Sequence, residues 1–276
     1  MISKQELDKE LSQIPPFAAS LMRLTDIILS GNYTIDDVCN VVKLDQALTI
    51  DVIGYSNSAE SGSIKSISSV QEALVRMGGA RIMRFLLAKW FRGSVAASMG
   101  SSADSSLFWK HGVNAAVATD VLAEEIPSLR HPAAFTASLV HDVGWVPFAS
   151  WSQHHHQDFN WKLLRNEGNQ KELARYGFTH MEVGALILEK WRFSKETVEA
   201  VRSHSEPGSG PHPLTDSIRF ANVICHHLEE KAPPPVSEIQ LALMKRYCVS
   251  DFQFALMVDI SREAVAKTME EFGVSG

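Results

Sequence analysis

The chain has 276 residues, a formal net charge of −6, 45% hydrophobic residues and 21% charged residues. This length suits one large domain or two small ones, and the ordinary charge content excludes a wholly disordered chain. The negative balance argues against a protein that binds nucleic acid by overall electrostatic attraction.

Helix-start signals recur along the chain. In a capping box, a serine or threonine and a glutamate or glutamine three residues later satisfy each other's backbone amides. The pattern occurs at Ser3–Glu6, Thr179–Glu182, Ser237–Gln240 and Ser250–Gln253, and apolar residues follow each at helical spacing. Alternating β-branched runs closed by Asn-Gly or Asp-Gly turns are missing from the sequence. The sequence therefore predicts an all-α fold.

The expected organisation is a single domain over residues 1–276 with three parts. An N-terminal helical half covers about 1–97 and is interrupted at Gly78-Gly79, a histidine-bearing helical half covers 105–230, and C-terminal helices cover 236–276. Cys39, Cys225 and Cys248 are far apart and no CxxC occurs, which fits a reducing cytosol. Neither a secretory signal nor an apolar run of about 18 residues is visible, so we expect a soluble, cytoplasmic protein with no membrane partner.

The most informative stretch is PAAFTASLVHDVGWVPF, in which His141-Asp142 interrupts an apolar run. Burying an unpaired carboxylate is costly, so Asp142 requires a partner. Pro132 and Gly144 frame a predicted helix over 133–143, and His141 and Asp142 then lie in its last turn.

Three more histidines stand on separate predicted helices. His111 lies within a long helix, His180 directly follows the Thr179 cap, and His204 closes a helix that begins near Ser194. Imidazole nitrogen with carboxylate oxygen suits a divalent transition metal such as Fe, Mn, Zn, Co or Ni, and the sequence does not select among them. The predicted ligands are His111, His141, Asp142, His180 and His204.

Taken singly, each of these residues has a simpler interpretation. A histidine near a helix end is usually a cap or a satisfied polar group, and an aspartate two residues before a glycine is often a turn residue. The run His154-His155-His156 is expected at the surface, because three consecutive residues of one helix cannot converge on one ion. Only the combination of the five residues points to a metal centre.

The motifs resemble a known family. SLVHDVGWVPF is similar to the HD motif of the HD-domain superfamily of metal-dependent phosphohydrolases, and HMEVGALILEKW resembles the His-Pro-Glu-x-Gly segment of its cyclic-dinucleotide-hydrolysing branch. The N-terminal half is very similar to the HDOD domain, an all-helical, HD-related signalling and regulatory output domain of bacteria. The similarity extends over about residues 5–272, with markers at Ile14-Pro15-Pro16, Asp45–Leu48, Ser56–Ala59, Ala73-Leu74 and Met77-Gly78.

The resemblance implies an HD-domain-like helical bundle whose catalytic set is incomplete, with His111, His141, Asp142, His180 and His204 as the retained ligands. Three departures from the active branch stand out: Trp145 replaces a lysine, Ser205 replaces a second histidine, and Asn222 occupies the position of a later aspartate. An asparagine offers an amide oxygen without the charge that helps to hold a divalent ion and activate water. Asp216 would replace that aspartate only if its helix started differently.

The favoured interpretation is therefore a bacterial signal-transduction domain of the HDOD type, without catalysis, that binds a partner protein or a small ligand. We expect a protein partner from a signalling pathway, and no catalytic residue is assigned. The alternative is a metal-dependent phosphohydrolase acting on a cyclic dinucleotide or a nucleotide phosphodiester. Nucleic-acid binding through the basic segment from Arg81 to Arg92 is the least favoured, because basic side chains that flank a buried helix explain it as well. The oligomeric state and the identity of the metal stay open.

Overall fold

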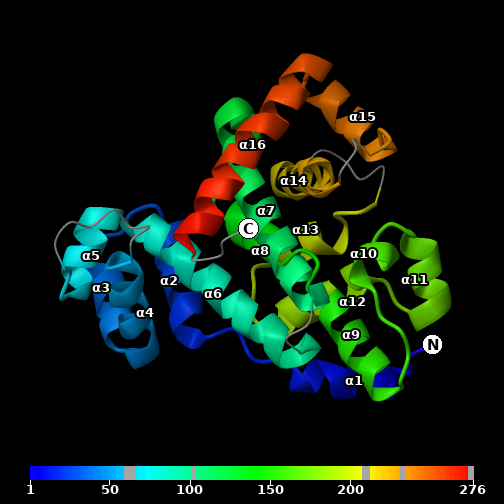
Figure 1. Cartoon of the computed structure of the whole chain (residues 1–276), viewed down its shortest axis with the longest axis horizontal. Coiled ribbons are helices and arrows are strands. Elements are labelled where there is room, and N and C mark those ends of the chain that lie inside the picture. Colours follow the sequence, from blue (N-terminus) through cyan, green and yellow to red (C-terminus); the bar gives the residue numbers. More distant parts are fainter. Residues whose placement is uncertain (59–65, 101–102, 207–211, 231–233, 273–276) are drawn as a thin grey trace. The chain divides into compact units, whose positions relative to one another are not determined.

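The computed structural model describes the chain except residues 59–65, 101–102, 207–211, 231–233 and 273–276 (Figure 1). Within the described residues the secondary structure is helical, with α-helices from α1 to α16 and no strand. The prediction of an all-α fold is confirmed. In the same part of the chain, no helix combines the length and the apolarity that crossing a membrane requires.

The chain divides into two compact units. Unit 1 contains residues 1–15 and 91–265, and unit 2 contains residues 16–90 and 266–276. The first fifteen residues, which the sequence grouped with the N-terminal half, thus belong to unit 1. The prediction of a single domain over the whole chain stays a prediction.

Unit 2 is built from short helices whose termini are tied by side chains. Its helices are α2 (Ala19–Leu29), α3 (Ile35–Lys43), α4 (Gln46–Ser56), α5 (Val70–Met77), the first half of α6 (Gly79–Met99) and the end of α16 (Asp251–Glu271). Asp45 caps α4 by accepting hydrogen bonds from the backbone amides of Ala47 and Leu48 and from Ser20 Oγ. Asn57 exchanges two hydrogen bonds of 2.7 Å with the backbone of Ile67. The Asp45 and Asn57 markers of the sequence are therefore structural residues.

The basic residues near the start of α6 have partners inside unit 2. Arg81 Nη2 lies 2.9 Å from Glu271 Oε1. The Lys89 ammonium pairs with the Asp51 carboxylate. Charges engaged in this way agree with the structural interpretation of this segment rather than with a nucleic-acid-binding surface.

Unit 1 holds the larger core and all five predicted metal ligands. Its helices are α1 (Lys4–Gln13), the end of α6, α7 (Ala103–Glu125), η2 (Pro127–Leu129), α8 (Ala134–Leu139), α9 (Trp145–His154), α10 (Trp161–Leu164), α11 (Asn169–Tyr176), α12 (His180–Lys190), α13 (Lys195–Arg202), α14 (Pro213–Glu229), α15 (Glu238–Arg246) and most of α16. The capping boxes predicted at Ser3 and Thr179 are both present. Ser237 and Ser250 also cap their helices.

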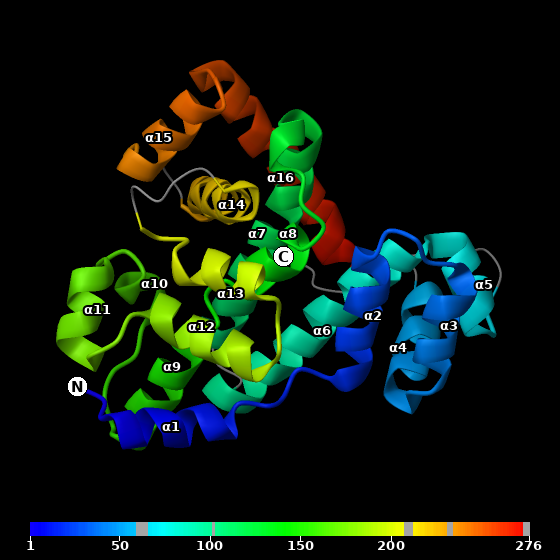
Figure 2. The same ribbon diagram turned by 180° about the vertical axis from the view of Figure 1, so that it is seen from behind.

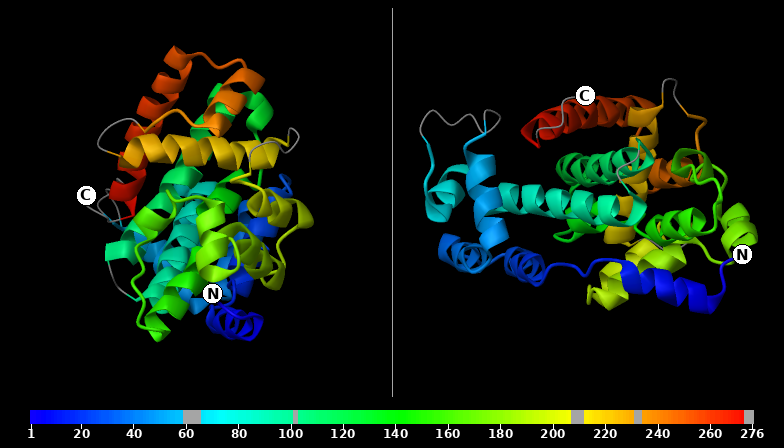
Figure 3. Two further views of the ribbon diagram at one scale, coloured as in Figure 1. Left: turned by 90° about the vertical axis from the view of Figure 1, so that its right-hand side faces the viewer. Right: turned by 60° about the horizontal axis from the view of Figure 1, so that its bottom comes forward.

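Helices α7, α8 and α14 form the centre of unit 1. Helix α14 packs on both α7 and α13 (Figure 3), and α12 packs on α9 and α13 (Figure 2). The core between α7, α14, α15 and α16 includes Leu122, Phe220 and Ile224, which are fully buried. Gly112 permits a close crossing of α7 and α8, because a Cβ there would meet the Leu139 carbonyl oxygen at 2.5 Å. This crossing brings His111 beside the turn that follows α8.

Candidate metal centre

His141 and Asp142 lie in a turn between two helices. The predicted helix over 133–143 is wrong at its end: α8 stops at Leu139, and α9 begins at Trp145 with Gly144 as its N-cap. Gly144 has an ordinary helical φ of −63°, so it is not needed for an unusual backbone conformation. A glycine is required here because there is no room for a side chain: a Cβ at this position would lie 1.8 Å from the His180 carbonyl oxygen. The turn therefore sets the His-Asp pair directly against the start of α12.

Four imidazoles converge on the carboxylate of Asp142. The Nε2 atoms of His141, His180 and His204 each lie 3.4 Å from Asp142 Oδ1. His111 Nε2 lies 3.6 Å from Asp142 Oδ2. The four histidines are at most 5% exposed and Asp142 is 7% exposed. The structure thus brings together all five residues that the sequence selected.

Their positions in the secondary structure follow the sequence in part. His111 lies inside α7, and His180 is the first residue of α12 after the Thr179 cap, as predicted. Ser194 caps α13 as predicted, but α13 ends at Arg202, so His204 lies two residues beyond it. The ligands therefore come from a helix interior, a helix start and two turns.

The Nδ1 atom of every one of these histidines is held from outside the cluster. His141 and His204 each donate a 2.7 Å hydrogen bond to a backbone carbonyl, of Ser138 and Val201 respectively. In the other two cases the acceptor is a carboxylate: His111 bonds Glu229 at 2.9 Å, and His180 bonds Glu172 at 2.8 Å. A neutral imidazole that donates through Nδ1 leaves the lone pair of its Nε2 free, which is the tautomer a metal ligand needs.

The protonation states suit metal binding at neutral pH. Burial lowers the pKa of His141 to about 3, so this imidazole is neutral. Burial alone would raise the pKa of Asp142, but the surrounding histidines hold it well below its usual value and keep the carboxylate charged. For His180, burial opposes the proton, yet the hydrogen bond to Glu172 and the charge of Asp142 outweigh it and raise the pKa. A metal ion would therefore have to displace a proton mainly at His180.

These donors fit a divalent transition metal. His111, His141 and Asp142 form one group whose ligand atoms lie within 4.8 Å of one another, and Asp142, His180 and His204 form a second. Among the described residues, Nε2 of His111 and Nε2 of His141 are buried without a hydrogen-bond partner. Buried polar atoms rarely lack a partner, and a bound ion is a standard explanation. Nitrogen with carboxylate oxygen is the donor set for Zn, Fe, Mn, Co or Ni, and it does not identify which.

Sequence reasoning missed the polar residues behind His111. Glu229, at the end of α14, accepts a 2.7 Å hydrogen bond from Arg165 Nη1 as well as the bond from His111. Burial by itself would raise the pKa of Glu229, but His111 and Arg165 lower it to about 2. Cys225, His111 and Glu229 form a third group of nearby potential ligands. Glu229 lies 118 residues from His111, so no local sequence signal connects them.

The structure shows the surroundings of two residues that differ from the active branch, Trp145 and Asn222, and of Asp216. Trp145 is fully buried and its ring stacks on His180, with centroids 5.0 Å apart and planes at 12°. Asn222 lies on α14 one turn before Cys225, and its Oδ1 is buried without a hydrogen-bond partner among the described residues. Asp216 is not a substitute: its carboxylate is bound by Arg246 at 2.6 Å and by Tyr247 at 2.8 Å. That alternative for the missing acid is therefore disfavoured.

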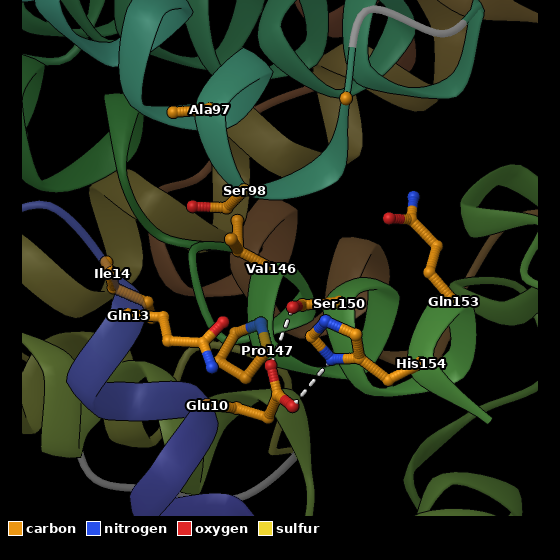
Figure 4. A pocket seen from close by; sticks show the side chains of 11 residues that line it. Glu10, Gln13, Ile14, Ala97, Ser98, Val146, Pro147, Ser150, Gln153 and His154 are labelled. Carbon is orange, nitrogen blue, oxygen red and sulfur yellow. Dashed lines mark hydrogen bonds and ion pairs between the residues drawn. The ribbon is translucent and has the colours of Figure 1, made fainter.

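A second polar region lies beside α1. A cavity of about 310 Å³ is lined by residues of α1, the end of α6 and α9 (Figure 4). Glu10 faces it and accepts hydrogen bonds from Ser150 Oγ at 2.6 Å and His154 Nδ1 at 3.0 Å. The His154 and His155 side chains are 51% and 42% exposed, in agreement with the expected surface position of the histidine run.

Comparison with known proteins places the chain in a family. Residues 14–207 match the HDOD domain. The chain belongs to the HDOD domain family. In this HDOD chain, four histidines converge on one aspartate in groups that could hold a metal ion.

Solved structures share the fold of this HDOD chain. A candidate signal transduction protein from Marinobacter aquaeolei VT8 matches with a TM-score of 0.74 at 17% identity, covering 98% of this chain and 65% of that one. A candidate phosphohydrolase from Shewanella amazonensis SB2B matches with a TM-score of 0.67 at 18% identity, covering 98% of both chains. An uncharacterized protein of Treponema pallidum (strain Nichols) is 23% identical over 237 residues. The chain spans 44% of that relative's length, and the match covers 81% of this chain.

Proposed function

We propose that this HDOD chain is a metal-binding signal-transduction domain that acts by binding a partner protein or a small ligand rather than by catalysis. The observation that carries the metal site is the convergence of four Nε2 atoms on Asp142, each imidazole held through Nδ1. His111, His141, Asp142, His180 and His204 would hold the metal, as two groups of three ligands that share Asp142. A divalent ion there would supply a fixed positive charge and a Lewis acid.

Three features argue against turnover. The ligand side chains are between 0% and 9% exposed, so a substrate as large as a dinucleotide has no direct approach to them. Asn222 supplies no charge where the active branch has an acid, and the apolar ring of Trp145 covers His180 where that branch has a cation. Phosphate groups bind where positive charge and donors are available, and a buried indole offers little of either.

The alternative function is a metal-dependent phosphohydrolase. It is supported by the four retained histidines around Asp142 and by the phosphohydrolase name of the Shewanella structure. Under this alternative the deprotonated, buried Asp142 and the neutral imidazoles would position an ion that activates water.

Hydrolysis assays separate the two functions. Purified protein without an affinity tag would be loaded with Mn²⁺ or Fe²⁺ and incubated with cyclic dinucleotides and with bis(p-nitrophenyl) phosphate. The proposal expects bound metal with turnover absent or far below the usual enzymatic range of ~1–1000 per second. Turnover within that range would replace the proposal with the phosphohydrolase. If the protein bound no metal at these five residues, the proposed centre would be ruled out.

A further inference from the structure

Glu172 is a buried carboxylate that is hydrogen-bonded to one of the predicted ligands, His180. It lies on α11 and is 3% exposed. Its two oxygens lie 3.0 Å and 2.8 Å from His180 Nδ1, and Oε2 also accepts the His180 backbone amide at 2.8 Å. Glu172 thus fixes both the ring of His180 and the start of α12.

The charges around the centre are unevenly compensated. Glu229 is paired with Arg165, whose side chain is 5% exposed. Within the described part of the chain, the ion pairs of Asp142 and Glu172 involve histidines alone, with no lysine or arginine. When the four imidazoles are neutral, as metal ligands must be, two buried negative charges remain. The partial positive charge at the N-terminus of α12, about half an elementary charge, offsets only a part of them.

Two uncompensated carboxylates in a protein interior are costly unless a cation joins them. Asn222 carries no charge where the active branch has an acid, and Glu172 provides a buried negative charge outside the predicted ligands. A carboxylate that accepts a hydrogen bond from a ligand histidine raises the basicity of that ligand and strengthens the metal bond.

We infer that Glu172 is a positioning residue that supplies, through His180, the negative charge missing at Asn222. The inference rests on the proposed metal-binding function. It assigns a role to a residue outside the five predicted ligands.

The test compares Glu172→Gln with a matched control. The substitution keeps the side-chain shape and removes the charge. Glu10→Gln is the control, because Glu10 is likewise buried, at 4% exposure, and likewise accepts a hydrogen bond from a histidine Nδ1, but it belongs to the α1 cavity. Zn²⁺ and Mn²⁺ affinities would be measured by competition with a chromophoric chelator, bound metal by elemental analysis, and folding by circular dichroism.

We expect bound metal in the unaltered protein, an affinity about 10- to 100-fold weaker in Glu172→Gln, and no more than about a twofold change in Glu10→Gln. Glu172→Asp, which restores the charge, should recover part of the loss. Equal affinity of Glu172→Gln and the unaltered protein would overturn the role of Glu172. No bound metal in the unaltered protein would instead overturn the proposed function itself.

Discussion

Unit 1 contains two buried glutamates that each bind a histidine Nδ1, and the two pairs have different surroundings. Glu172 bonds His180 at 2.8 Å, and Glu10 bonds His154 at 3.0 Å. The far nitrogen of His180 lies among three other imidazoles around Asp142, whereas the His154 side chain is half exposed at a cavity. The comparison shows that residue type and hydrogen-bond length do not distinguish a candidate metal ligand from a surface pair. Convergence of several donors in a buried space does.

The largest expected effect comes from filling the space between α9 and α12. In Gly144→Ala, the new Cβ would lie 1.8 Å from the His180 carbonyl oxygen and 2.6 Å from the Gly184 amide nitrogen, and neither backbone atom can turn aside. We expect the free energy of unfolding to fall by about 3 kcal/mol or more and metal binding to be lost. Chemical denaturation measures the first and metal titration the second.

Gly93→Ala is the matched control, because Gly93 lies inside α6 and a Cβ there would meet nothing within 4 Å. It should stabilise the protein by about 0.5–1 kcal/mol. A Gly144→Ala protein as stable as the unaltered chain would show that the close approach of α9 and α12 does not position His180.

Removing the negative charge of Asp142 should have the next largest effect, on metal affinity. In Asp142→Asn, the cluster loses its only carboxylate ligand among the five residues, so metal affinity should fall by more than about 100-fold, beyond the range of outer-shell changes. Equilibrium titration with Zn²⁺ measures the affinity, and circular dichroism controls for folding. If Asp142→Asn bound the ion as tightly as the unaltered protein, the metal would have to lie elsewhere.

Metal affinity should also depend on pH. The raised pKa of His180 means that the apo protein keeps a proton on this imidazole at pH values where an ordinary histidine, near 6.5, has lost it. The ion must displace that proton, so affinity falls by about tenfold per pH unit below the raised pKa and levels off above it. Glu172→Gln lowers the pKa of His180 by removing a partner of the charged form, and the onset of this decline should move to lower pH. An affinity independent of pH between 5 and 8 would argue against His180 as a ligand.

Restoring the missing acid should have a moderate effect. Asn222→Asp adds a carboxylate on α14, one turn before Cys225, and we expect roughly a tenfold gain in metal affinity. Asn166→Asp, at an exposed position of unit 1, controls for the change in net charge. Equal gains in the two variants would mean that Asn222 does not face the ion.

The smallest effect should come from the α1 region. His154→Gln breaks the contact with Glu10 at a half-exposed side chain, so the free energy of unfolding should change by less than about 1 kcal/mol. Metal affinity should stay within about twofold of the unaltered protein. A clear loss of metal in His154→Gln would show that the histidine run, rather than the HD pair, binds the ion.

The sequence predicted the all-helical fold because capping boxes are local signals. It predicted the residues that converge because the HD pattern and the family resemblance connect histidines on separate helices. It misplaced His141 and Asp142 in a helix, because Pro132 and Gly144 suggested caps. In the structure, Gly144 is required instead by the backbone of α12, which a pattern within one segment does not reveal. Glu172 and Glu229 were missed for a related reason: Glu229 reaches His111 across 118 residues, and Glu172 lies in a polar helix that shows no motif.

The most direct test of this account is the metal content of the untagged protein beside that of Asp142→Asn, after both are incubated with a slight excess of Zn²⁺ and freed of unbound ion. We expect tightly held metal in the unaltered chain and none in the variant. The same metal content in both proteins, or none in the unaltered chain, would contradict a metal centre at the four histidines and Asp142.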